Sequence, residues 1–189
     1  MSKALVLGCG ASGIASVRFL KRRGWIAALA DTRERPSSLA EFRAEFPDVP
    51  FTGGTLPDDL LAGCDALVLS PGLSPEHSAV SPLVDKARAS GIDVLGEIEL
   101  FARELVHLNK TQGYRPKVVA VTGTNGKTTT TRLTGLMVRQ ANCTVCTAGN
   151  IGLNAVSELD RLLEAGKLPD FWVLELSSFQ LATTTSLHC

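Results

Sequence analysis

The sequence has no excess of either charge, no long apolar run and no low-complexity tract. Its 189 residues carry 19 basic and 19 acidic side chains, which balance to a formal net charge of +0. A broad electrostatic surface for nucleic acid or anionic membrane is therefore not expected. No apolar stretch approaches the ~20 residues of a membrane-spanning helix, and the run Ala4–Leu7 is too short for a signal peptide. We expect a folded, cytoplasmic protein.

Cysteine and histidine are too scattered to indicate a disulfide framework or a zinc site. The five cysteines form an odd, widely spaced set. Cys143 and Cys146 have CxxC spacing, but we place both in a strand, where residues three apart point to opposite faces. His77, His107 and His188 lie far apart and show no ligand spacing. Reduced, mostly buried thiols are expected.

Short apolar runs alternate with amphipathic segments, which is typical of βαβ units. This alternation predicts an α/β fold with a mostly parallel sheet covered on both faces. In the first part of the chain we expect strands at 3–7, 25–30, 66–69 and 92–95, and helices at 12–23, 38–46, 81–90 and 97–108.

A polar segment that ends in proline, residues 109–116, predicts a linker between two domains. The first domain would be Rossmann-like and span 1–108, and the second would begin the P-loop ATPase domain at 117 and run to 189. In the second we expect strands at 117–121, 143–147 and 171–176, and helices at 127–140 and 153–164. A three-stranded parallel sheet would leave an apolar edge uncovered. We therefore expect the chain to be part of a longer protein.

A GxGxxG pattern, formed by Gly8, Gly10 and Gly13, lies between a predicted strand and a predicted helix. Glycines let backbone N–H groups approach a diphosphate, which the helix N-terminus also attracts. Asp31 lies at the end of the next strand, where a dinucleotide fold places its ribose-binding acid. These features indicate NAD or another diphosphate ligand such as a UDP-sugar, while a turn without a ligand is the structural alternative.

A second glycine-rich turn has the chemistry of a P-loop. In such loops backbone amides cradle phosphates, and here Lys127 would reach the β- and γ-phosphates while Thr128 would bind Mg²⁺. The segment departs from the general GxxxxGK[ST] pattern, because Val121 occupies the first glycine position and a glycine stands at 123. This departure indicates a narrower subclass of P-loop proteins.

Two further residues follow predicted strands of the second domain. Glu175 ends a strand one βαβ step after the P-loop, where a carboxylate could reach the metal of a nucleotide. Asn150 lies in the turn after another strand. Each could also be an ordinary strand-end or turn residue.

Residues 122–129, Thr-Gly-Thr-Asn-Gly-Lys-Thr-Thr, resemble the ATP-binding signature of the Mur ligase superfamily, which includes the folylpolyglutamate synthetases. Further short motifs make the chain most similar to the branch that adds D-glutamate. These motifs lie at 8–13, 31–33, 70–72, 96–101, 149–152 and 174–181.

The resemblance implies a role for each matching residue. The UDP part of the substrate would contact Ala11, Ser12, Asp31, Thr32, Arg33 and Gly72, and its sugar-peptide end would contact Asn150, Ser177 and Gln180. ATP would contact Gly123, Thr124, Asn125, Gly126, Lys127, Thr128 and Thr129. Thr128 and Glu175 would bind Mg²⁺, and Lys127 and Glu175 would be the catalytic residues.

The implied reaction joins D-glutamate to UDP-N-acetylmuramoyl-L-alanine with ATP, through an acyl phosphate. It belongs to peptidoglycan precursor synthesis, and so to cell-wall biogenesis, cell shape and cell division. The resemblance further implies a monomer with small-molecule substrates, without nucleic-acid or membrane partners. The D-glutamate site would follow Cys189, so we expect these residues alone to be inactive. The alternatives are another amino-acid ligase of the superfamily, an NAD-dependent oxidoreductase and a non-catalytic nucleotide-sugar-binding module.

Overall fold

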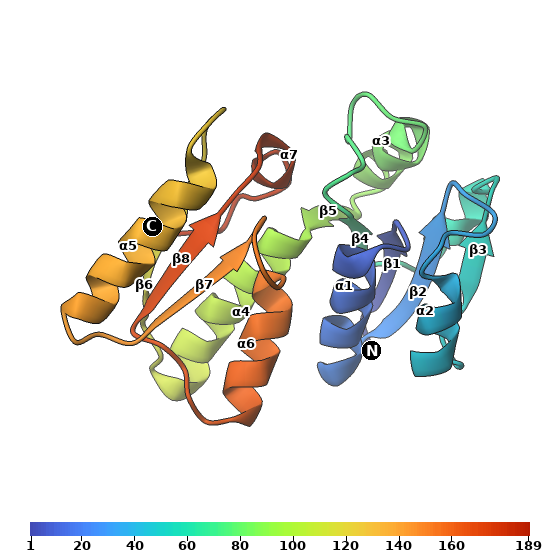
Figure 1. The fold of residues 1–189 in the computed structure, drawn as a ribbon. Coiled ribbons are helices and arrows are strands. Elements are labelled where there is room, and N and C mark those ends of the chain that lie inside the picture. The colour runs from blue at the N-terminus through green and yellow to red at the C-terminus, as the bar shows by residue number, and fades with distance from the viewer. The chain divides into compact units, whose positions relative to one another are not determined.

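The computed structural model contains two separate parallel sheets. It describes residues 1–189 except for the side chain of Asp58. The chain divides into two units, Met1–Glu97 and Ile98–Cys189. Helices and strands alternate in both (Figure 1). This confirms the predicted α/β class with parallel sheets.

The first unit has a five-stranded parallel sheet in the order β3-β2-β1-β4-β5. The order reverses between β1 and β4, and ligands of open α/β sheets bind at such a reversal, beyond the carboxyl ends of the strands. Its strands are β1 (Lys3–Leu7), β2 (Ile26–Asp31), β3 (Phe51–Gly53), β4 (Ala66–Leu69) and β5 (Asp93–Gly96), and its helices are α1 (Ala11–Arg22), α2 (Leu39–Glu45), the 3₁₀ helix η1 (Asp58–Leu61) and α3 (Ser81–Ala89).

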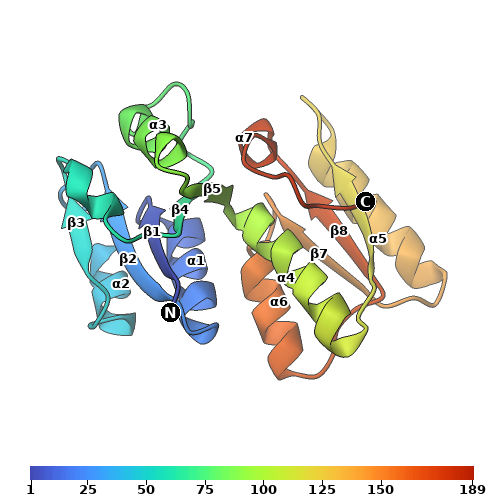
Figure 2. The ribbon, with the colours of Figure 1, turned by 180° about the vertical axis from the view of Figure 1, so that it is seen from behind.

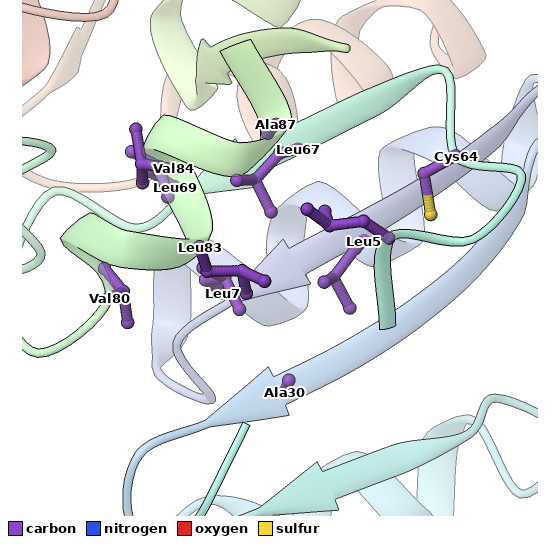
Figure 3. Close-up of a cluster of buried hydrophobic side chains, with 11 residues drawn as sticks. Leu5, Leu7, Ala30, Cys64, Leu67, Leu69, Val80, Leu83, Val84 and Ala87 are labelled. Atoms are coloured by element: carbon purple, nitrogen blue, oxygen red, sulfur yellow. The ribbon is translucent and has the colours of Figure 1, made fainter. Parts of the chain in front are cut away.

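The core of this unit explains why its central strands are continuous apolar runs. All four residues of β4 and four of the five in β1 are buried, because helices cover both faces of a parallel sheet. Leu5 and Leu7 of β1 pack with Leu83 and Val84 of α3 on one face (Figure 3). Side chains alternate along a strand, so Ala4 and Val6 of β1 face the other side.

The second unit has a three-stranded parallel sheet in the order β6-β8-β7. The central strand ends at Glu175, which is in register with Val121 on one side and Gly149 on the other. All three strands therefore end at one level. The elements are α4 (Glu97–Gln112), β6 (Lys117–Val121), α5 (Lys127–Gln140), β7 (Val145–Gly149), α6 (Ala155–Glu164), β8 (Phe171–Glu175) and α7 (Ser178–Leu181).

Helices cover both faces of the second sheet (Figures 1 and 2). Phe101 of α4 packs edge-on against Trp172 of β8, with ring centroids 4.9 Å apart. Glu158 of α6 lies on the same face, because it accepts a hydrogen bond from Cys146, the register partner of Trp172. Helix α5 lies on the opposite face.

The junction between the units differs from the linker expected at 109–116. The division falls between Glu97 and Ile98, and helix α4 continues through the expected boundary at 108 to Gln112. The apolar face of α4 packs within the second unit, where Phe101 contacts Trp172. The Tyr114 hydroxyl donates to the carbonyl of Pro169 (2.7 Å) and accepts from the Trp172 indole N–H (2.9 Å). The presumed linker is thus fastened to the second unit.

Other differences concern short or irregular segments. The sequence pattern did not predict β3, η1 or α7, each of only three or four residues. Strand β7 begins at Val145, so Cys143 precedes it, contrary to the expectation for the CxxC pair. Asn142 adopts a left-handed conformation (φ 58°), and the strand begins only after this turn. None of the helices in the described part of the chain has the length and apolar character that crossing a membrane would require.

We predict that Tyr114→Phe destabilises the second unit by about 1–3 kcal/mol. The change would leave the Trp172 indole N–H and the Pro169 carbonyl without their shared partner, and unpaired buried polar groups cost about this much. Urea unfolding followed by tryptophan fluorescence measures the effect. Phe171→Leu, which removes a half-buried ring next to Trp172 in β8, serves as a control for lost packing. A Tyr114→Phe protein as stable as wild type would show that the two Tyr114 hydrogen bonds do not stabilise the second unit.

Candidate functional site

The first glycine-rich turn connects β1 to α1 and requires its glycines. Gly8 has φ +100°, and a Cβ there would lie 2.7 Å from the Ser70 hydroxyl. A Cβ on Gly13 would lie 1.8 Å from the Gly8 carbonyl oxygen. Ser70 donates to that same carbonyl (3.1 Å), which holds the turn after β4 against the turn after β1.

The N-terminus of α1 is well suited to an anion. The first N–H groups of a helix have no intrahelical acceptor, and Gly10 caps this helix without a side-chain hydrogen bond. Its first turn carries no acidic residue, so the helix dipole is free to favour a phosphate. Ala11, after β1, and Gly72, after β4, are exposed, and Ser12 is half-buried.

Asp31 is buried beneath this turn and is held by the protein itself. Its carboxylate accepts from the Cys9 backbone N–H (2.7 Å), the Arg33 backbone N–H (2.8 Å) and the Arg33 guanidinium, through Nε (2.8 Å) and Nη2 (2.7 Å). The side-chain bonds from Arg33 outweigh burial and lower the pKa of Asp31 to about 2. The charge is therefore neutralised internally.

Thr32 and Arg33 follow Asp31 at the carboxyl end of β2. Both residues are exposed, and the Arg33 side chain retains 60% of its accessible surface. The structure thus brings the first-unit residues of the sequence prediction to the carboxyl ends of β1, β2 and β4. Asp31 lies underneath and orients Arg33.

The second glycine-rich turn connects β6 to α5. Gly123 (φ +144°) and Gly126 (φ +77°) adopt left-handed conformations that side chains disfavour. The Lys127 ammonium donates to the Gly123 carbonyl (2.7 Å), which closes the loop on itself. Helix α5 begins at Lys127, and its first turn carries no acidic residue. Residues 123–126 and Thr129 are exposed, so backbone N–H groups here are accessible to phosphates.

Glu175 joins this turn to the neighbouring strand. The residue is only 3% exposed. Its Oε2 accepts from the Thr128 hydroxyl (2.8 Å), and its Oε1 accepts from the Asn150 amide (3.3 Å). Three residues from three elements therefore converge at the carboxyl end of the sheet.

The donor set at this point fits Mg²⁺. Among the described residues, no three His, Cys, Asp or Glu side chains lie together in a group that could hold a metal ion. Mg²⁺ needs no such cage, because it is bound by one or two carboxylates together with waters and substrate phosphates. The Thr128 and Glu175 oxygens lie 2.8 Å apart, close to the roughly 3 Å between adjacent ligands of an octahedral Mg²⁺ at about 2.1 Å.

Ser177 and Gln180 are already bonded to each other. The Ser177 N–H donates to the Gln180 side-chain oxygen (2.9 Å), and the Gln180 N–H donates to the Ser177 hydroxyl (3.2 Å). This capping box begins helix α7 immediately after the strand that carries Glu175. Contact of these two residues with a substrate stays a prediction.

Glu99 is a buried acid that the sequence pattern did not assign to any role. Its carboxylate accepts from the backbone N–H groups of Thr185 (2.7 Å) and Ser186 (2.9 Å), and from Arg103 (2.9 Å). Burial alone would raise the pKa of Glu99, but these bonds and the one from the Ser186 hydroxyl lower it to about 2. Glu99 fixes the segment that follows α7. Two signals for it were present in the sequence, the motif at 96–101 and the Ser/Thr-rich composition of its partners, but neither identified these contacts.

The chain resembles known proteins along most of its length. Residues 2–96 match the family model described as Mur ligase MurD-like, N-terminal domain, and residues 121–188 match that of the Mur ligase middle domain. A relative from Ralstonia nicotianae, named UDP-N-acetylmuramoylalanine–D-glutamate ligase, is 54% identical over 183 residues, which are 97% of this chain and 37% of that protein. A relative of the same name from Cupriavidus pinatubonensis is 50% identical, over 97% of this chain and 36% of its own length.

A similar solved structure is that of UDP-N-acetylmuramate-alanine ligase MurC from Thermotoga maritima, with a TM-score of 0.49 and 19% sequence identity, over 94% of this chain and 37% of that one. The chain thus spans little more than a third of the length of its relatives.

We predict that Asp31→Asn lowers the free energy of unfolding by about 1–2 kcal/mol at pH 7. A pKa lowered from 3.8 to about 2 corresponds to a little more than this, but the exposure of Arg33 screens part of it. Because the folded pKa is depressed, the contribution is present above pH 4 and is lost as the pH falls toward 2. Urea unfolding of both proteins from pH 7 to pH 2 measures it, with Glu34→Gln as the exposed control. A stability difference that stays constant over this range would contradict the prediction.

Proposed function

This chain belongs to the Mur ligase family, as the motifs predicted, and on that basis we propose that its protein is an ATP-dependent ligase that adds D-glutamate to UDP-N-acetylmuramoyl-L-alanine. The observation that carries the proposal is the convergence of Thr128, Glu175 and Asn150 beside a P-loop lysine, in a chain 54% identical to a relative with that name. The proposed role is one step of peptidoglycan precursor synthesis.

The first unit would bind the UDP moiety. The diphosphate would lie at the N-terminus of α1, where backbone N–H groups and the helix dipole favour it. Ala11, Ser12 and Gly72 would line the turn, and Thr32 and Arg33 would contact the uridine. Asp31 would act through Arg33, because its carboxylate already accepts four hydrogen bonds from Cys9 and Arg33.

The second unit would bind ATP and Mg²⁺. The backbone of residues 123–129 would surround the phosphates, and Lys127 would exchange the Gly123 carbonyl for a phosphate oxygen. Thr128 and Glu175 would hold Mg²⁺, which neutralises charge on the transferred phosphoryl group.

The reaction would proceed in two balanced steps. A carboxylate oxygen of the L-alanine attacks the γ-phosphorus, the bond to the β-phosphate oxygen breaks, and ADP leaves. The amine of D-glutamate then attacks the acyl phosphate carbonyl, phosphate leaves, and an amide forms with loss of a proton. Lys127 would offset the charge of the transferred group, and Asn150, Ser177 and Gln180 would orient the sugar-peptide end.

We predict that the chain binds UDP-N-acetylmuramoyl-L-alanine saturably and does not bind NAD. Arg33→Ala should weaken the nucleotide-sugar about tenfold or more, because a lost bond to a charged group costs about 1.5–3 kcal/mol. Arg35→Ala, an equally charged and exposed neighbour, is the matched control. Isothermal titration calorimetry measures the binding of each ligand to the unaltered chain and to both variants. Binding of NAD with no response to the UDP compound would overturn the ligase proposal in favour of an oxidoreductase.

We predict that Lys127→Ala weakens ATP binding about tenfold or more, since the loop would lose its one charged phosphate ligand. Lys167→Ala changes an exposed lysine elsewhere in the same unit and should bind ATP as wild type does. Competition against a fluorescent ATP analogue measures both. Equal affinities for the two variants would remove the P-loop from the proposed mechanism.

A further inference from the structure

Asn150, in the turn after β7, has a second role besides the proposed contact with the substrate. We infer that Asn150 is a positioning residue that holds the carboxylate of Glu175 in the orientation needed to bind Mg²⁺. This inference rests on the proposed function, because it concerns the same metal site.

Asn150 holds Glu175 at both ends. Its side-chain amide donates to Glu175 Oε1 (3.3 Å), and its backbone N–H donates to the Glu175 carbonyl (2.8 Å). Asn150 is exposed, whereas Glu175 is 3% exposed. The amide therefore reaches from an exposed turn to a buried carboxylate.

The backbone at Gly149 makes this reach possible. Gly149 is in register with Glu175, has φ +104°, and a Cβ there would lie 2.4 Å from the Glu175 carbonyl oxygen. Any other residue would push the turn away from β8. The close approach places the next residue, Asn150, within hydrogen-bond distance of the acid.

The two carboxylate oxygens of Glu175 have different partners. Thr128 donates to Oε2, and Asn150 donates to Oε1. Thr128 is itself a proposed Mg²⁺ ligand, so the bond from Asn150 is the one that can stay unchanged when the metal binds. It stops the carboxylate from rotating and keeps Oε2 directed to the P-loop. Partners of this kind typically change metal affinity by about 10–100-fold when they are removed.

The inference adds to the substrate contact implied by the family resemblance and does not exclude it. A side-chain amide has two N–H donors and one oxygen acceptor. The bond to Glu175 uses one donor, which leaves the other donor and the oxygen for a ligand.

The decisive measurement is the factor by which Mg²⁺ strengthens ATP binding, obtained by calorimetry with and without Mg²⁺. In Asn150→Ala we expect this factor to fall about tenfold, with ATP affinity in the absence of Mg²⁺ unchanged. Asn150→Leu, which has the same number and branching of side-chain heavy atoms but no donor, should behave alike. Leu153→Ala, an exposed residue of the same loop, should keep the wild-type factor.

A double-mutant cycle separates positioning from an independent role. If Asn150 acts through Glu175, Asn150→Ala should have no further effect on the Mg²⁺ factor in a Glu175→Gln background. Additive losses would overturn the inference. So would a wild-type Mg²⁺ factor in Asn150→Ala, or an equal loss of ATP affinity without Mg²⁺, which is the result expected of a purely structural role. Wild-type protein that binds ATP with no Mg²⁺ dependence would instead refute the metal site of the proposed function.

Discussion

The second unit depends on keeping one charged group, the carboxylate of Glu175, buried at the end of its central strand. A buried charge is stable only if it is paired or hydrogen-bonded. Here the requirement is met by the P-loop hydroxyl of Thr128 on one side and by the amide of Asn150 on the other. The β6-β8-β7 order makes this possible, because the turns after both outer strands border the end of β8.

The first unit solves the same problem differently. Asp31 is also a buried acid at the end of a strand beside a glycine-rich turn, but its partner is the guanidinium of Arg33. Its charge is compensated by the protein, whereas the two bonds described for Glu175 come from neutral groups. An uncompensated carboxylate favours a cation, and a compensated one does not. This contrast supports a metal at Glu175 and an organic ligand beside Arg33.

Much of this architecture could be read from local patterns. Strands β1, β4 and β6 and helix α5 have the bounds that periodicity predicted, and both glycine-rich turns lie between a strand and a helix. These features depend on neighbours in the sequence, such as glycine at left-handed positions and apolar residues in runs. Short elements such as β3 and α7 escaped prediction because three or four residues are too few to show a period.

The sequence by itself therefore determined the α/β class, the two glycine-rich turns, the strand-end acids and the family. Tertiary structure decided which groups meet: Asn150 with Glu175, Arg33 with Asp31, and Glu99 with the segment at 185–186. It also decided that helix α4 and Tyr114 belong to the second unit. The reason is physical. Strand register and helix packing set these contacts between residues that are often far apart along the chain, and local patterns of hydrophobicity and turn residues carry no information about them.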